Sequence, residues 1–374
     1  MIPFNRPSFD GQELAYLAQA VANGHTAGNG PFTKRAESLL SEMHGGSSTL
    51  LTTSCTHALE LSARLLNLGP GDEVIVPAYT FVSTASAFVW NGAKPVFADI
   101  DPQTMNIDPN QVRELVNPRT RAVCIVHYAG IGAQPDAFAQ LADELDLVLI
   151  EDNAHGLGAS YGEQTLGTFG SMSTLSFHET KNITCGEGGA LVINDHRLLE
   201  RAEILREKGT DRSKFIRGQV DKYTWVDIGS SWVLSDLLAG VLVGQLERFT
   251  EIQDARMKLW NEYDMALMDW ANESGVHRPF IPAPARHPGH MFYLVFETGS
   301  DRDRYIEHMR QSEVLTVFHY QDLASSRMAH ALGSAGDCPN ARAMAERLVR
   351  LPLFASMSDA EQARVIEATR AFEL

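Results

Sequence analysis

Lys181 and Asp152 carry the clearest chemistry in this sequence, because each follows a run of apolar residues typical of a buried strand. Residues 147–150 (LVLI) lead into Asp152, and Met172, Leu175 and Phe177 lead towards Lys181. A lysine amine can form a Schiff base with the aldehyde of pyridoxal phosphate (PLP), and a carboxylate can pair with its pyridine nitrogen. The pair therefore predicts a PLP site in which Lys181 and Asp152 are the catalytic residues.

Both residues also have ordinary explanations. Most lysines lie on the surface, and an aspartate after a strand is often the N-cap of a helix. The strand before Lys181, the glycine-rich residues 186–189 after it and the partner acid favour the buried site. Desolvation there would favour the neutral amine that a nucleophile or base requires. For Asp152, the cap and the cofactor role are compatible.

Residues 54–56 (SCT) precede an amphipathic helix and could hold the phosphate of the same cofactor. Small hydroxyl residues at a helix start are usually caps, but that position also offers free N–H groups and a positive dipole end to an anion. We expect Ser54, Cys55 and Thr56 to form the phosphate site and Ser176 to add a hydroxyl.

An aromatic residue and a histidine complete the expected cofactor site. Phe81 follows another strand end and could stack on the cofactor ring, although most such aromatics are core residues. His155 follows Asp152 closely and could bind the phenolic oxygen of the cofactor or merely fill the wall of the pocket. The residues alone leave both choices open.

These residues require a particular arrangement of strands and helices. Short Val- and Ile-rich runs alternate with helical patterns from about residue 50 to 195, which predicts a mostly parallel sheet covered on both faces. We expect strands at residues 74–77, 95–100, 123–127, 147–150, 175–177 and 190–193. We expect helices at residues 56–66, 111–116 and 136–144. Ligands bind beyond the carboxyl ends of such strands, where Asp152 and Lys181 fall.

The second half of the chain predicts a smaller α+β domain. Residues 232–270 are helical in pattern, and a proline-rich stretch at 279–288 follows them. We then expect an alternating strand at 291–296, a helix at 302–310 and a strand at 314–319. The last helix opens at Ser358 with a capping-box pattern. We place the large domain, with the N-terminal segment, at 1–250 and the linking helix with the small domain at 251–374.

Composition narrows the function classes. The 374 residues carry a net charge of −16, which argues against a general nucleic-acid surface. The four cysteines are far apart and no metal-spaced cluster occurs, so neither a disulfide framework nor a metal site is expected. Because the start lacks a signal-peptide pattern and no apolar run is long enough to span a membrane, we expect a cytoplasmic protein.

With these residues in place, the chain resembles the DegT/DnrJ/EryC1/StrS family of PLP-dependent sugar aminotransferases, which have the fold type I (aspartate aminotransferase-like) fold. The resemblance spans nearly the whole length. It rests on residues 28–33 (GNGPFT), 77–85 (PAYTFVSTA), 151–156 (EDNAHG), the segment around Lys181 and residues 351–354 (LPLF).

Other segments resemble one subgroup of the family, whose product is a dTDP-linked 4-amino-4,6-dideoxygalactose. They are residues 177–182 (FHETKN), 206–213 (REKGTDRS), 217–225 (RGQVDKYTW) and 227–231 (DIGSS). The resemblance implies a dTDP-4-keto-6-deoxyhexose acceptor, with L-glutamate as donor and 2-oxoglutarate as second product. Galacto configuration is favoured and gluco stays open, as does amination at C3.

The family resemblance also implies a homodimer with shared sites. Many members have an Asn-aromatic-Arg run where this chain has Ser231-Trp232-Val233, and that asparagine reaches the phosphate in the neighbouring subunit. Here Ser231 would do so. Lys208, Arg212, Lys222 and His319 are candidate substrate contacts, although a solvated surface explains the three cations nearly as well.

The expected activity is a two-step transamination. Two alternatives remain: a PLP-dependent sugar dehydratase of the same fold, in which histidine replaces the lysine, and a PLP-binding regulator without catalysis. Lys181 stands at the lysine position, which disfavours the dehydratase. No basic stretch or extra domain is apparent that would favour the regulator.

Overall fold

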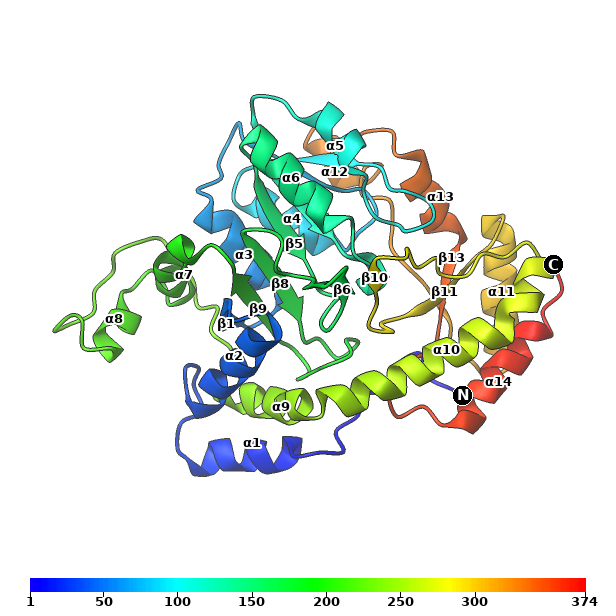
Figure 1. Ribbon diagram of the computed structural model, residues 1–374, viewed down its shortest axis with the longest axis horizontal. Helices are drawn as coiled ribbons and strands as arrows, with labels where there is room; N and C mark the ends of the chain where they lie inside the picture. Colours follow the sequence, from blue (N-terminus) through cyan, green and yellow to red (C-terminus); the bar gives the residue numbers. More distant parts are fainter.

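The computed structural model describes residues 1–374, and its centre is a seven-stranded sheet in the order β1-β9-β8-β5-β4-β2-β3 (Figure 1). The strands are β1 (Ser48–Thr52), β2 (Glu73–Pro77), β3 (Lys94–Ala98), β4 (Thr120–Val126), β5 (Val148–Asp152), β8 (Met172–Ser176) and β9 (Gly189–Ile193). Neighbours from β8 to β3 are parallel, whereas β9 is antiparallel to both β8 and β1. The predicted mostly parallel sheet is confirmed, and β1 is a strand that the prediction missed.

Helices cover both faces of this sheet, which explains why its strands are apolar without alternation. On β4, Val123 and Ile125 pack into one core with residues of α5 and α6, while Ala122 and Cys124 pack into another with α3 and α4. The helices of this unit are α1 (Glu13–Ala22), α2 (Pro31–Met43), α3 (Cys55–Leu65), α4 (Val82–Trp90), α5 (Pro109–Leu115), α6 (Pro135–Leu145), α7 (Leu199–Arg206) and α9 (Asp236–Glu247). The minor elements are the 3-10 turns Tyr128–Gly130 and His196–Leu198 and a small sheet of β6 (Ser160–Tyr161), β7 (Gln164–Thr165) and β10 (Ala285–Arg286).

The long helix α10 (Phe249–Glu273) leads to a second, three-stranded antiparallel sheet in the order β11-β13-β12 (Figure 1). Its strands are β11 (Phe292–Val295), β12 (Val317–Phe318) and β13 (Leu348–Leu351), and its helices are α11 (Gly299–Gln311), α12 (Arg327–Ala331), α13 (Pro339–Arg347) and α14 (Asp359–Arg370). The capping box at Ser358 is present. The strand expected at 314–319 is shorter than predicted, since β12 contains only residues 317–318. The alternating pattern of β11 predicted one buried face, but both of its faces are buried because a separate core lies on each side.

The N-terminal residues pack against this smaller unit. Ile2 pairs with Val314, and Arg6 forms an ion pair with Glu361 of α14. The division of the chain near residue 250 stays a prediction, but these contacts place the first residues beside the C-terminal elements rather than beside the large sheet.

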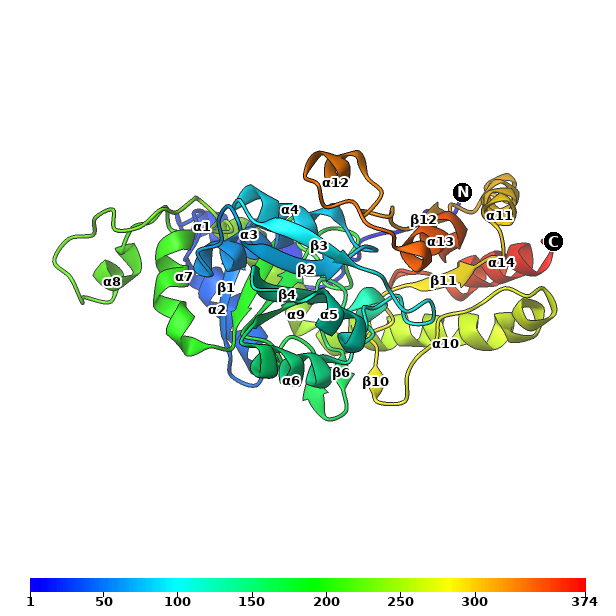
Figure 2. The ribbon, with the colours of Figure 1, turned by 90° about the horizontal axis from the view of Figure 1, so that it is seen from above.

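A segment from about 208 to 228, which contains α8 (Arg212–Ile216), projects away from the body of the molecule in both views (Figures 1 and 2). We call it the arm. Several of its large apolar side chains are exposed: Phe215, Ile216, Tyr223, Trp225, Val226 and Ile228. No helix of the chain combines the length and apolar character needed to cross a bilayer. All four cysteines are free thiols.

Candidate active site

One cavity of about 550 Å³ lies where the carboxyl ends of the parallel strands face the small sheet. Its wall comes from the start of α3, the loop after β2, the ends of β5 and β8, and residues of the smaller unit. The cavity collects these predicted site residues: Ser54, Cys55, Thr56, Phe81, Asp152, His155, Ser176, Lys181 and His319.

Asp152 is the last residue of β5, and its side chain is buried. The Thr84 hydroxyl donates to Oδ2 at 2.7 Å, and the backbone N–H of Ala154 donates to Oδ1 at 3.2 Å. Burial raises the pKa of the Asp152 carboxyl above its usual value, and the hydrogen bond from Thr84 opposes that rise. No helix follows β5 directly, so the alternative reading of Asp152 as a helix N-cap is wrong.

Lys181 reaches the same cavity from the loop after β8. Its amine has neither a hydrogen bond nor an ion pair with any residue of the chain. Burial lowers the pKa of Lys181 from 10.5 to about 8, although the nearby Cys55 and Asp152 oppose that change. An unpartnered amine with a lowered pKa is suited to act as a nucleophile or base near neutral pH.

The start of α3 offers an anion site on another part of the cavity wall. Ser54 is the N-cap, and its Oγ accepts from the N–H of His57 at 3.1 Å. The N–H groups of Cys55 and Thr56 have no partner within the chain, so they can bind an anion at the positive end of the helix. Gly189, the first residue of β9, lets this strand pack closely against the start of α3, since a Cβ at residue 189 would lie 2.3 Å from the carbonyl carbon of Ser54.

The protonation of His155 follows from its neighbours. The backbone N–H of Ala129 donates to Nδ1 at 3.3 Å, which leaves the proton on Nε2, and Nε2 lies 3.2 Å from the Tyr320 hydroxyl. Burial holds the pKa of His155 well below its ordinary value, so the ring is neutral. The ring stacks on His290 at 4.3 Å. A neutral histidine with a fixed Nε2–H can donate a hydrogen bond to a ligand oxygen in the cavity.

His319 lies in the wall contributed by the smaller unit, where its Nδ1 is 2.9 Å from the Tyr128 hydroxyl. Phe81 is 55% exposed at the mouth of the cavity, with its ring 6.2 Å from that of Tyr320. Ser176 ends β8 and also lines the cavity. The individual roles of these residues stay predictions.

Four predicted residues do not reach the cavity of their own chain. Ser231 is exposed and pairs with Glu207. Lys208 and Arg212 also approach Glu207, with ion-pair distances of 3.2 and 4.0 Å, and Lys222 is exposed on the arm. Within one chain these four residues cannot serve the site, so their predicted roles require a second subunit.

Sequence reasoning missed several residues of the cavity wall, among them Thr84, His290, Tyr320 and Arg350. Thr84 lies within the segment 77–85, and Arg350 immediately precedes the segment 351–354, so the sequence locates both residues but gives neither of them a role. His290 and Tyr320 carry no local signal, because only the packing of the smaller unit brings them to Lys181.

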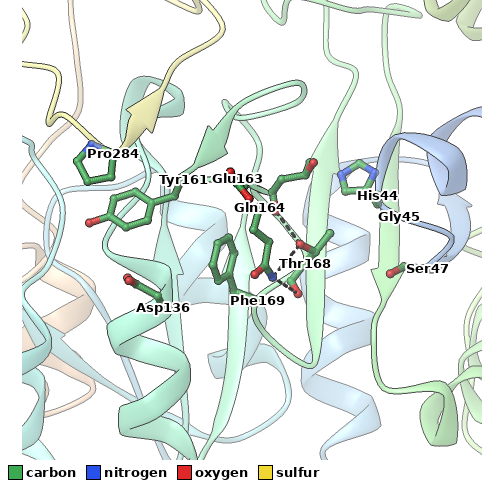
Figure 3. Close-up of a pocket in the computed structure, with 12 residues that line it drawn as sticks. His44, Gly45, Ser47, Asp136, Tyr161, Glu163, Gln164, Thr168, Phe169 and Pro284 are labelled. Carbon is green, nitrogen blue, oxygen red and sulfur yellow. Dashed lines mark hydrogen bonds between the residues drawn. The ribbon is translucent and has the colours of Figure 1, made fainter.

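A larger hollow, of about 880 Å³, lies elsewhere on the surface (Figure 3). It is lined by the carboxylates of Asp136 and Glu163, and no lysine or arginine faces it. The Gln164 side-chain N–H groups donate there to the backbone carbonyl and the hydroxyl of Thr168. The smaller cavity, which contains Lys181 and the α3 N-terminus, is therefore the better site for an anionic ligand.

The fold and this cavity define an aminotransferase that uses PLP. The residues present fit that cofactor: free N–H groups at α3 suit its phosphate, the unpartnered Lys181 amine its aldehyde, and the buried Asp152 carboxylate its ring nitrogen. A family model described as the DegT/DnrJ/EryC1/StrS aminotransferase family matches residues 7–370, and the chain belongs to that family.

Individual relatives agree over nearly the full length. The chain is 30% identical to the spore coat polysaccharide biosynthesis protein SpsC of Bacillus subtilis, covering 99% of this chain and 96% of SpsC. The aminotransferase TlmJ of Streptoalloteichus hindustanus has a TM-score of 0.91 at 32% identity, with 99% and 98% of the two chains covered. Spr1654 of Streptococcus pneumoniae, described as a sugar aminotransferase, has a TM-score of 0.91 at 27% identity in its PMP form, with the same coverage.

Proposed function

We propose that the enzyme is a dTDP-4-amino-4,6-dideoxygalactose transaminase. It transfers the amino group of L-glutamate to C4 of dTDP-4-keto-6-deoxy-D-glucose and releases 2-oxoglutarate. The observation that carries the transamination is the meeting of the Lys181 amine and the Asp152 carboxylate in one cavity with a free helix N-terminus. The particular sugar is supported by the subgroup segments at 177–182, 206–213 and 217–231.

In this proposal each residue handles a proton or an anion at a defined place. PLP, when bound, carries the amino group between the two half-reactions and withdraws electrons from the bond to be deprotonated. Lys181 takes the proton from Cα of glutamate and later delivers a proton to C4 of the sugar. Asp152, held by Thr84, keeps the ring nitrogen protonated. The face on which Lys181 protonates C4 decides between the galacto and gluco products.

We further propose a homodimer in which the arm of one subunit completes the site of the other. An exposed group of aromatic and aliphatic side chains on a projecting segment is costly in water and typical of an interface. The same segment carries Lys208, Arg212 and Lys222, which suit the diphosphate of the sugar nucleotide. Ser231 follows the arm and would contact the cofactor phosphate in the partner subunit.

The substrate is tested by incubating the PLP-loaded enzyme with L-glutamate and dTDP-4-keto-6-deoxyglucose. We expect stoichiometric 2-oxoglutarate and an aminated sugar whose C4 configuration is assigned by NMR. Amination at C3 would contradict the proposed acceptor position. Loss of a sugar hydroxyl without transfer of the amino group to the sugar would identify a dehydratase, and no turnover with any keto sugar would favour a regulator.

Shared sites are tested by mixing two variants, Lys181→Ala and Arg212→Ala, each of which we expect to be inactive alone. In a mixed dimer, one site combines an intact Lys181 with an intact arm from the other subunit. Random exchange makes half of the dimers mixed, so about a quarter of the wild-type activity should return. No recovery after demonstrated exchange would show that each chain builds its site alone.

A further inference from the structure

His290 is a buried histidine of the cavity wall that the proposed reaction does not use. It lies two residues before β11, and its ring stacks on that of His155 with the centroids 4.3 Å apart. The buried Arg256 of α10 holds the backbone at this point. Its Nη2 donates to the carbonyl of His290 at 2.6 Å, and its Nε donates to the carbonyl of Gly289 at 3.2 Å. The His290 ring is therefore fixed at one place in the wall.

Asn182, the residue after Lys181, determines which nitrogen of the His290 ring carries the proton. The Asn182 Nδ2 donates to the backbone carbonyl of Pro288 at 2.8 Å, and a carbonyl oxygen can only accept. This bond fixes the orientation of the amide, so that Oδ1 faces His290 Nδ1 at 2.8 Å. Nδ1 must therefore carry the hydrogen of this second bond. Nε2 keeps a bare lone pair and has no partner in the chain, on a ring that lines the cavity.

The ring of His290 stays neutral, so Nε2 does not gain a proton of its own. Burial holds the pKa of His290 well below its ordinary value, and the nearby His155 and Lys181 lower it further. His155 has the opposite tautomer, because its Nδ1 accepts from a backbone N–H and its Nε2 carries the hydrogen. The two stacked rings thus offer a donor and an acceptor to ligands in one cavity.

A lone pair that faces the cavity requires a hydrogen-bond donor on the ligand. The carboxylates of glutamate and the phosphate of the cofactor offer oxygens that accept, and the phenolic oxygen of the cofactor suits the Nε2–H of His155. The amine of glutamate is the group that reacts at Lys181, and the ring nitrogen of the cofactor pairs with Asp152. The hydroxyl groups of the sugar are the donors that remain for His290.

We propose that Nε2 of His290 accepts a hydrogen bond from the C3 hydroxyl of the nucleotide sugar. The inference rests on the function proposed above and names a residue that selects its substrate. In the 4-keto-6-deoxyhexose only C2 and C3 carry hydroxyl groups, since C1 bears the diphosphate and C6 is a methyl carbon. C4 must approach the Lys181 amine, and C3 is bonded to C4. Because Asn182 links the Lys181 loop directly to His290, the C3 hydroxyl is the nearer of the two.

The test measures sugar binding by calorimetry in the PLP-loaded enzyme without glutamate, so that no turnover occurs. His290→Phe keeps a flat ring against His155 but removes the acceptor. His277→Phe, an exposed position in the same stretch between α10 and β11, is the matched control. With dTDP-4-keto-6-deoxyglucose, we expect the Kd to rise about tenfold in His290→Phe and to stay unchanged in the control.

Two analogues of the sugar identify the hydroxyl. Without the C3 hydroxyl, the Kd values of His290→Phe and wild type should agree within about threefold, whereas without the C2 hydroxyl the tenfold difference should persist. Equal Kd values with the parent sugar would overturn the proposal. A difference that disappears only with the 2-deoxy analogue would assign His290 to C2 and contradict it. An equal rise with all three sugars would show a structural role instead.

The donor half-reaction, followed by absorbance without any sugar, tests whether the substitution disturbs His155. The kcat/KM for L-glutamate should change by less than about threefold in His290→Phe. A loss there as large as the loss in sugar binding would refute a role specific to the sugar.

NMR of the histidine ring nitrogens in the PLP-loaded enzyme reads the tautomer directly, with His290→Phe giving the assignment. Nε2 of His290 should be unprotonated, and its resonance should move when the keto sugar is added. A proton on Nε2 would refute the proposal. Neither NMR nor calorimetry requires turnover, so a wild type whose affinity depends on the C3 hydroxyl but which forms no 4-amino product would refute the proposed function alone.

Discussion

The lowered pKa of Lys181 makes a quantitative prediction about how fast the cofactor-free enzyme captures PLP. Only the neutral amine can attack the aldehyde. A lysine with its usual pKa of 10.5 is about 0.03% neutral at pH 7, whereas a pKa of about 8 makes it about 10% neutral. The enzyme therefore holds about 300-fold more reactive amine than an exposed lysine does at that pH.

The direction with pH follows from the sign of the shift. Burial disfavours the charged form, so the neutral fraction of Lys181 rises steeply below its pKa and levels off above it. We expect the second-order rate of PLP attachment to increase about tenfold per pH unit up to about pH 8 and then to reach a plateau.

Stopped-flow absorbance of the lysine-bound cofactor, between pH 7 and 10, measures this rate. Nα-acetyl-lysine gives the behaviour of a solvated amine, and Lys181→Ala gives the background. A rate for the enzyme that keeps rising to pH 10 in parallel with Nα-acetyl-lysine would refute the reasoning that burial prepares the amine. A plateau that also appears in Lys181→Ala would assign the reaction to another lysine.

Three other substitutions test the site and its support. Asp152→Asn should keep the cofactor but slow steady-state turnover by about 100-fold or more, because an amide cannot hold the ring nitrogen protonated; an unchanged rate would remove Asp152 from that role. Glu151 accepts from the N–H groups of Gly167, Phe169 and Gly170, so Glu151→Gln should lower the free energy of unfolding by about 3 kcal/mol in urea denaturation. The same midpoint as wild type would show that these bonds are replaceable. Ser358→Ala removes the cap of α14 and should cost about 1 kcal/mol with unchanged kcat, and a large loss of activity would contradict a purely local effect.

Much of the large sheet could be predicted because most of its strands contain a continuous apolar run that is visible in the local sequence. Residues buried on both faces must be apolar throughout, and the predicted strands overlap β2, β3, β4, β5, β8 and β9. The missed strand, β1, contains Ser48, Thr49 and Thr52, which weaken the apolar signal, and it pairs only with β9 at the edge. Its existence depends on a partner far along the chain.

The residues of the candidate site also fall into two groups, those that the sequence reveals and those that only the structure reveals. Lys181 and Asp152 could be found because a reactive residue at a strand end has a recognisable local setting. Arg350 could not be assigned a role from the sequence, because the residues around it look like those of any half-buried strand. Only the packing of β13 between β11 and β12 directs it into the cavity and leaves it without a partner.

By itself the sequence determined which residue types stand at the ends of the strands, and with them the cofactor and the family. Local apolar runs and short motifs are enough for that, because they depend on neighbours along the chain. The tertiary structure decided the lowered pKa of Lys181, the Nε2–H of His155 and the unpaired charge of Arg350. These properties arise from burial and from contacts between distant segments. Such burial and contacts exist only in the folded chain, where residues of both units line the cavity.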